Sequence, residues 1–141
     1  MSDDLEKIVA FIDKHHVLSL ATSYDNELSV CSLFYCYDKL TNSFIVASND
    51  ETTHINHIKK NRNIAANILL ETKEVSKIQG LQLRGEFLEL QNKTLQKLYF
   101  EKFPCAINKV KKFWSIEVNY FKMTDNSLGF AKKIILKDFS L

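Results

Sequence analysis

The order of strand-like and helix-like segments constrains this chain more than any other feature. Segments rich in β-branched, aromatic or small apolar residues, bounded by polar turns, occur at residues 17–22, 28–37, 44–48, 64–70, 80–90 and 114–120. The regular strand–helix alternation that a parallel sheet requires does not occur. The order predicts a mainly β fold with some α-helix: a six-stranded antiparallel barrel with helices at its edge.

Helical patterns flank or separate these segments. Residues 3–15 carry apolar side chains at i, i+3, i+4 and i+7, which predicts an amphipathic helix. A short helix is expected from residue 53 to about residue 61, with its isoleucines toward the core and with His54 and His57 on other faces. A third helix is expected over residues 92–103, because the proline that follows cannot continue it.

The period-two pattern predicts which side chains of the later strands share a face. In the fifth strand one face holds Leu81, Leu83, Gly85 and Phe87, and the other holds Gln82, Arg84 and Glu86. A glycine in mid-strand, as at Gly85, indicates a bulge or a close approach of backbone or ligand. In the last strand the residues expected on one face are Trp114, Ile116, Val118 and Tyr120.

Length and charge limit the functions that are open to the chain. Its 141 residues suffice for one domain, residues 1–141, and are too few for two. Lysine and arginine number 19 against 17 acidic residues and are mostly scattered, so no nucleic-acid-binding face is expected. The chain starts with acidic residues and contains no long apolar stretch, so we expect neither a signal peptide nor a membrane span. A cytoplasmic location is therefore predicted.

The cysteines and histidines do not form a metal-binding pattern. Cys31 and Cys36 lie five apart in one expected strand, so their side chains face opposite sides and cannot easily share a bridge or a metal. Cys105 stands alone, and all three cysteines are expected to be reduced thiols. His54 and His57 have no third ligand or H-E-x-x-H pattern beside them, so no metal site is predicted.

The turn after the third strand holds the densest group of candidate binding residues. Ser48, Thr52 and Thr53 place hydroxyl groups where the chain enters the short helix, and His54 follows them. Free backbone N–H groups, hydroxyl donors and the positive end of a helix dipole together form an anion site. The same residue types also serve as plain helix N-caps. Spacing alone leaves both interpretations open.

Residues 46–54, VASNDETTH, resemble the strand-to-helix segment of pyridoxamine phosphate oxidase-like flavin-binding split barrels. In that family a hydroxyl residue at the strand end, and then a serine followed by two basic residues, hold the flavin phosphate. Ser48 matches the first hydroxyl, Thr52 the serine and His54 the second basic residue, while Thr53 stands where the first basic residue is usual. The resemblance implies a phosphate site for flavin mononucleotide (FMN) that includes Ala47 and these four residues.

Residues 28–36 are similar to the second strand of that family, which lies along the isoalloxazine ring. Cys31 and Cys36 occupy the places of an arginine and a lysine of the vitamin-making oxidases, which speaks against pyridoxamine phosphate as the substrate. The resemblance implies that the ring is contacted by Val30, Cys31, Ser32 and Leu33, and that a glutamine approaches from the fifth strand, either Gln79 or Gln82.

Within that superfamily the match extends over nearly the whole chain to the YhbP-like group of bacterial proteins, which lack an assigned reaction. The specific stretches are QGLQLRG at residues 79–85 and YFKMTDNSLGFAKK at residues 120–133, where Asp125 and Asn126 are expected to order a turn by bonding their own backbone. The resemblance implies a homodimer with the cofactor at the subunit interface.

Three functional hypotheses follow from the residues and the resemblance. The first is an FMN-dependent oxidoreductase of unknown substrate, in which the flavin supplies the reactivity and no residue is identified as catalytic. The second is a protein that binds flavin or haem without turnover. The third is a structural dimer of the same fold without a cofactor.

Overall fold

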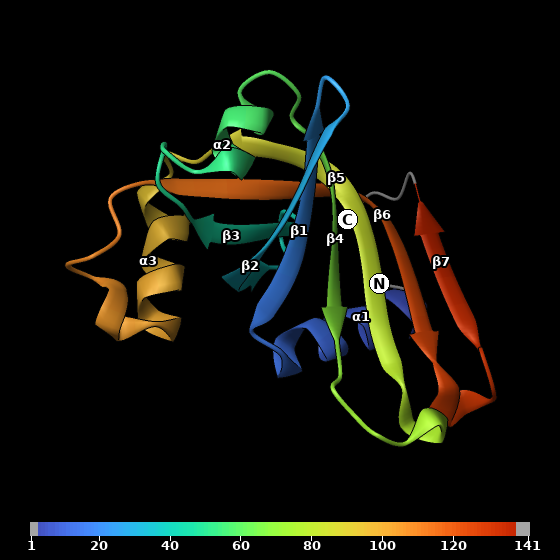
Figure 1. The fold of residues 1–141 in the computed structure, drawn as a ribbon. Helices are drawn as coiled ribbons and strands as arrows, with labels where there is room; N and C mark the ends of the chain where they lie inside the picture. The colour runs from blue at the N-terminus through green and yellow to red at the C-terminus, as the bar shows by residue number, and fades with distance from the viewer. Residues whose placement is uncertain (1–2, 138–141) are drawn as a thin grey trace.

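The computed structural model describes residues 3–137, so the outermost residues of the predicted domain, 1–2 and 138–141, lie outside the described part. Within that part the chain forms one sheet (Figure 1) of seven strands: β1 (Val17–Tyr24), β2 (Glu27–Asp38), β3 (Ser43–Ala47), β4 (Asn63–Leu69), β5 (Gln79–Glu89), β6 (Phe113–Asp125) and β7 (Lys133–Lys137). Their order is β3-β2-β1-β4-β5-β6-β7, every pair is antiparallel, and β3 also pairs with β6.

The pairing of β3 with β6 closes the first six strands into a ring. This confirms the predicted six-stranded antiparallel barrel. The seventh strand, β7, is an addition to the prediction. It pairs with residues 120–124 of β6, outside the ring.

The helices lie around the barrel (Figure 1). The described residues contain α1 (Asp3–Lys14), α2 (Thr53–Ile58) and α3 (Lys93–Lys102), with short 3-10 turns η1 (Val75–Lys77), η2 (Pro104–Ala106) and η3 (Asn126–Leu128). The three predicted helices are thus present, although α2 ends earlier than expected. Among residues 3–137, no helix has the length and apolar character to cross a membrane.

β2 changes its partner part of the way along its length. Residues 27–34 pair with β1, whereas Tyr35 to Asp38 pair with β3. The strands β2 and β3 therefore part before Tyr35, and α2 packs against β1 and β2. Within the described chain, no strand pairs with the edge of residues 28–34 that faces away from β1.

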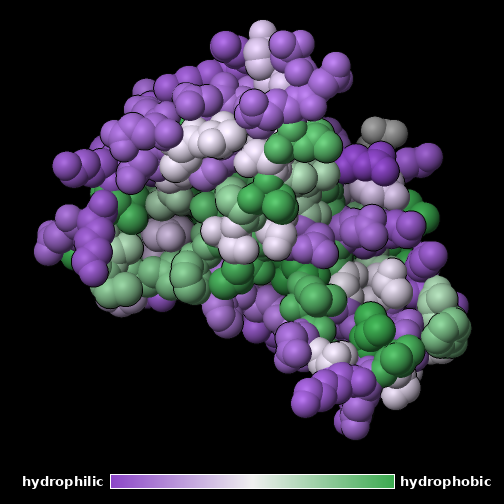
Figure 2. Space-filling view, in the orientation of Figure 1, coloured by the Kyte–Doolittle hydropathy of each residue, from purple (hydrophilic) through white to green (hydrophobic). Residues whose placement is uncertain are grey.

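The outward face of the sheet carries exposed apolar side chains. Leu28 and Val30 of β2 are 81% and 73% exposed, and Leu69 of β4 is 57% exposed. Hydrophobic residues gather across the middle of the face in Figure 2, over the region where β1, β4 and β5 lie in Figure 1.

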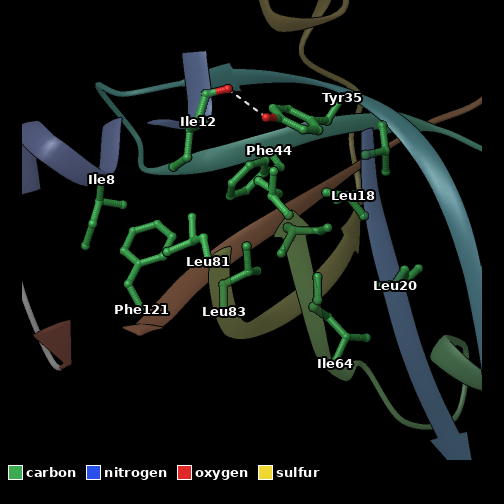
Figure 3. Close-up of a cluster of buried hydrophobic side chains, with 14 of the residues drawn as sticks. Ile8, Ile12, Leu18, Leu20, Tyr35, Phe44, Ile64, Leu81, Leu83 and Phe121 are labelled. Carbon is green, nitrogen blue, oxygen red and sulfur yellow. Dashed lines mark hydrogen bonds between the residues drawn. The ribbon is translucent and has the colours of Figure 1, made fainter. Parts of the chain in front are cut away.

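The inward face of the ring, together with α1, forms the main core. Figure 3 shows side chains from α1 and several strands directed toward one another, among them Ile8, Leu18, Phe44, Leu81, Leu83 and Phe121, all at most 1% exposed. The hydroxyl of the buried Tyr35 donates to the carbonyl of Ile12 at 2.6 Å. This bond joins the last turn of α1 to β2.

Gly85 lies at an irregularity between β5 and β6. Arg84 is opposite Tyr120 and Gly85 is opposite Val118, so Asn119 is an extra residue in β6. A Cβ at Gly85 would overlap the carbonyl oxygen of Glu117, which confirms the predicted close approach and bulge.

The extra residue also corrects the predicted face of β6. Trp114 and Ile116 belong to the buried core, as expected from their alternation. Tyr120 does not share their face, because the bulge shifts the alternation by one residue and Phe121 and Met123 point inward instead. Tyr120 lies on the outward face, where Arg84 is placed 4.2 Å from its ring centre.

Candidate functional site

The turn between β3 and α2 brings together several of the predicted binding residues. Thr52 is the N-cap of α2: its Oγ1 accepts a hydrogen bond from the N–H of Ile55 at 3.4 Å and donates one to the carbonyl of Asn49 at 3.1 Å. The N-capping interpretation of this turn is therefore confirmed. Thr53 is the first residue of α2 and is exposed, and Ala47 ends β3, where it pairs with Phe113.

His54 is the centre of this group. Its Nε2 lies 2.6 Å from the Oγ of Ser48 and 3.3 Å from the Oγ1 of Thr52, and its Nδ1 lies 3.4 Å from the Sγ of Cys31. The side chain is 7% exposed. The predicted outer placement of His54 is wrong, because partners on the turn and on β2 satisfy both ring nitrogens inside the protein.

The hydrogen-bond roles in this group depend on the tautomer of His54. With the proton on Nε2, the ring donates to Ser48 and Nδ1 accepts from the thiol of Cys31. With the proton on Nδ1, the hydroxyl of Ser48 donates to Nε2 and the ring donates to Cys31.

Burial keeps these groups uncharged. Desolvation, with a smaller contribution from the charge of His57, lowers the pKa of His54 below its usual value. Desolvation also raises the pKa of the Cys31 thiol. An anion at this turn would therefore meet hydroxyl and backbone N–H donors and not a histidine cation at neutral pH.

The neighbouring edge of β2 offers backbone groups. The N–H of Tyr35 donates to the carbonyl of His16 at 3.0 Å, which places Tyr35 in a hydrogen-bonded pair across β1. In an antiparallel ladder these pairs alternate, so the backbone groups of Val30, Ser32 and Phe34 point away from β1. They lie along the edge that has no neighbouring strand in the described chain.

The four predicted ring contacts on β2 divide between the two faces of the strand. Val30 and Ser32 are exposed on the outward face, whereas Cys31 and Leu33 point inward and pack against the core. Cys36 belongs to a second cluster under α3, which confirms that Cys31 and Cys36 face opposite sides.

A shallow hollow of about 330 Å³ lies on the outward face of the sheet. Small side chains form its floor: Ala21 of β1 is opposite Ala65 of β4, and Val30 is opposite Ala21 on the other side. The next row across the sheet is polar and consists of Ser32, Ser19, Asn67, Gln82 and Lys122. Small residues at alternate positions of β1 and β4 are the sequence signal that could have identified this hollow.

The two candidate glutamines of β5 have different surroundings. Gln82 lies in the hollow with Arg84 and Tyr120. Gln79 lies on the inward face at the α1 end, and its Nε2 is 3.4 Å from both carboxylate oxygens of Asp125. The side chain of Gln79 is thus committed to a structural contact.

Asp125 and Asn126 order the turn at η3. Asp125 accepts from the N–H of Ser127 at 2.9 Å, and the side-chain oxygen of Asn126 accepts from the N–H of Ala131 at 3.0 Å. The expected bonding of these side chains to nearby backbone is confirmed.

His57 forms a second polar network, which sequence reasoning missed. Its Nδ1 is 2.8 Å from the hydroxyl of Thr22 and its Nε2 is 2.8 Å from the carboxylate of Glu27. The ring is 5% exposed, so the expected outer placement of His57 is also wrong. Across residues 3–137, no three His, Cys, Asp or Glu side chains come together in a way that could hold a metal ion.

A six-stranded ring with its split between β2 and β3 defines the class of the protein as a split β-barrel. Solved structures with the same fold include a haem-binding protein from Mycobacterium smegmatis, with a TM-score of 0.78, 12% identity and coverage of 97% of this chain and 59% of that one. ChuZ of Campylobacter jejuni has a TM-score of 0.75 at 16% identity over 98% of this chain and 61% of its own. An FAD-binding protein from Mesorhizobium loti has a TM-score of 0.71 at 15% identity over 87% and 92%.

Sequence relatives identify the family. A UPF0306 protein of Campylobacter jejuni is 36% identical over 130 residues, which cover 92% of this chain and 95% of the relative. The UPF0306 protein YhbP of Salmonella arizonae is 30% identical over 135 residues, or 94% and 92% of the two chains. The chain belongs to the UPF0306 family. No family model matches it.

Proposed function

We propose that this chain binds flavin mononucleotide as a homodimer and acts as a flavin-dependent oxidoreductase. The observation that carries the proposal is the position of the hydroxyl turn. Ser48, Thr52 and His54 come together beside Cys31, next to the stretch of β2 whose backbone groups face an open edge. Hydroxyl groups suited to a phosphate and backbone groups suited to a flavin ring therefore lie side by side, which supports the proposal.

The phosphate would be held by neutral donors. Ser48 contributes a hydroxyl group at the turn, 2.6 Å from Nε2 of His54, and we assign it as one contact of the phosphate. His54 fixes the orientation of the serine oxygen and adds no charge, since burial lowers its pKa. Thr53, exposed at the start of α2, is the further hydroxyl residue that we assign to the phosphate.

The ring would lie along the open edge of β2. Backbone N–H and carbonyl groups of Val30 and Ser32 are suited to the polar edge of an isoalloxazine, which has both donors and acceptors. Gln82 lies across the neighbouring hollow and is the glutamine that we assign to the site. When bound, the flavin would supply hydride transfer, and the residues of this chain would position it and exclude water.

The homodimer is proposed from the exposed apolar face. Leu28 and Val30 lie beside the hollow whose floor is formed by Ala21 and Ala65. Leu28 is 81% exposed and Val30 is 73% exposed. A second copy packed on this face would bury them and close the open side of the flavin site. Leu28→Glu should then produce a monomer by gel filtration, whereas Leu40→Glu, at an 86% exposed turn position, should leave the dimer intact.

Flavin binding is tested by the visible spectrum of the purified protein after incubation with FMN and gel filtration. We expect a retained two-banded yellow spectrum. Ser48→Ala should weaken FMN binding by about tenfold or more, since a hydrogen bond to a charged group contributes about 1.5–3 kcal/mol. Ser76→Ala, in an exposed turn, is the matched control and should bind FMN like the unmodified protein.

Haem is the second candidate ligand, because a protein of the same fold is described as haem-binding. His54 is poorly suited to bind iron, since both ring nitrogens are engaged inside the protein. A Soret band after incubation with haem, with no retained flavin, would favour this alternative. Retention of neither ligand would leave the structural dimer without a cofactor. The cytoplasmic location stays a prediction.

A further inference from the structure

A row of side chains on the outward face of the sheet leads from the open edge of β2 to a cation on β5. Its members are successive cross-strand partners: Val30 is opposite Ala21, Ala21 is opposite Ala65, Ala65 is opposite Arg84, and Arg84 is opposite Tyr120. Directly opposite residues of an antiparallel pair share a face of the sheet. Three strand spacings, about 14 Å in all, separate Val30 from Arg84.

Two hollows on this face meet at Arg84. The hollow of about 330 Å³ is lined by all five residues of the row. A second hollow, of about 310 Å³, shares Ala21, Ala65 and Arg84 with the first and continues toward Leu28 and Asn63. Because the middle of the row consists of alanines, nothing larger than a methyl group rises from it between β2 and Arg84. Each volume is at the lower end of the range for small-molecule sites, so a small ligand has room to lie along the row.

Arg84 gives the two hollows their charge. Among the described residues that line them, it is the one charged side chain, and the others are apolar, aromatic, hydroxyl or amide residues. Its guanidinium lies 4.2 Å from the ring centre of the half-buried Tyr120. Within residues 3–137 no carboxylate pairs with it. The ring attracts the guanidinium and leaves its positive charge unneutralised. A single cation therefore lies at a surface that is otherwise neutral.

We infer that Arg84 binds the carboxylate of a small organic acid, whose apolar part lies over Ala65 and Ala21 toward the flavin ring. The inference rests on the proposed function and adds the substrate class of the same site. A guanidinium presents a planar fork of N–H donors that matches the two oxygens of a carboxylate. One cation balances one carboxylate, whereas a phosphate monoester carries about −1.5 to −2 charge. No second cation is present among the described residues that line the hollows.

The test uses benzoate as the probe and benzamide as a neutral molecule of the same shape, with binding measured by calorimetry. Benzoate should bind the unmodified protein about tenfold more tightly than benzamide, since hydrogen bonds between charged groups are stronger than neutral ones. Arg84→Gln should remove this preference. Arg62→Gln, which changes the other arginine of the chain, is the matched control. It should keep the preference, because Arg62 pairs with Glu86 and lines neither hollow.

Tyr120 is a positioning residue, because it holds the guanidinium of Arg84. Tyr120→Phe keeps an aromatic ring and should keep the preference for benzoate. Tyr120→Leu removes the ring and should weaken benzoate binding about two- to fivefold, while the affinity for benzamide stays the same. Equal losses for benzoate and benzamide in Tyr120→Leu would contradict this role.

The absorption spectrum of bound FMN distinguishes the inference from the proposed function. Benzoate should shift the flavin bands of the FMN-loaded protein and should not shift them in Arg84→Gln. Three results would overturn the inference and leave the flavin site standing: equal affinities for benzoate and benzamide, benzoate binding that survives Arg84→Gln, or unshifted flavin bands. A monomeric Arg84→Gln protein on gel filtration would also overturn it, because Arg84 would then pair with the second copy. If FMN is not retained while benzoate still binds through Arg84, the proposed function fails and the carboxylate site stands.

Discussion

Replacing Gly85 by alanine gives a direct test of the barrel geometry. A Cβ at this position would overlap the carbonyl oxygen of Glu117 and would lie 3.0 Å from its carbonyl carbon and 3.1 Å from the Cα of Val118. All three are backbone atoms of β6, which cannot rotate away as a flexible side chain would. Gly85→Ala must therefore push β5 and β6 apart at the bulge.

Two opposing effects change the free energy of unfolding. Overpacking that moves backbone lowers it by about 1–3 kcal/mol, and the rigid neighbours place this variant at the upper end of that range. Replacing glycine restricts the unfolded chain and raises it by about 0.4–1 kcal/mol. The free energy of unfolding should fall by about 2 kcal/mol, which for a chain of this size lowers the melting temperature by roughly 4–8 °C.

The assay is urea unfolding followed by circular dichroism, with Gly80→Ala as the matched control on the same strand. A Cβ at Gly80 would meet its nearest atoms at 3.8 Å, an ordinary contact, so this variant should be as stable as the unmodified protein or slightly more stable. If Gly85→Ala unfolds within about 0.5 kcal/mol of the unmodified protein, or if Gly80→Ala loses as much, the close approach of β6 is refuted.

Three further predictions concern buried polar groups. Folding lowers the pKa of His54, so the unfolded chain binds the proton more readily, and the free energy of unfolding should fall as the pH drops below 6.5. In His54→Asn the free energy of unfolding should change less with pH, as measured by unfolding between about pH 5 and 7. Tyr35→Phe removes the 2.6 Å bond to α1 and should lower the free energy of unfolding by about 1–3 kcal/mol in urea titrations, with unchanged stability counting against that bond. Thr22→Val leaves Nδ1 of His57 unpaired and should cost a similar amount, about 1–3 kcal/mol; an equally stable variant would show that the 2.8 Å contact contributes nothing.

Local patterns were sufficient to predict most of the fold. Strand alternation and the proline at 104 gave the six barrel strands and the end of α3 correctly, because both depend on neighbours in the sequence. The face of Tyr120 could not be predicted, since the extra residue at Asn119 arises from how β6 fits against Gly85 of another strand. β7 was not predicted, although the turn at Asp125 and Asn126 that leads from β6 to β7 was.

The candidate site was predictable in its residues and not in its electrostatics. The hydroxyl positions at Ser48 and Thr52 were readable from the turn sequence, and the structure brings them together with His54. The burial of His54 could not be predicted from the turn sequence, because Cys31, which lies in a distant strand, supplies a hydrogen-bond partner for the buried ring.

The position of β6 has a consequence for how the protein is made. Along one edge this strand pairs with β5, and along the other it pairs first with β3 and then with β7. During synthesis, β3 and β5 are complete long before residues 113–125 leave the ribosome. The nascent chain must therefore keep two strand edges unmatched until late in translation, and a ribosome that stalls before residue 113 would release an open sheet prone to self-association.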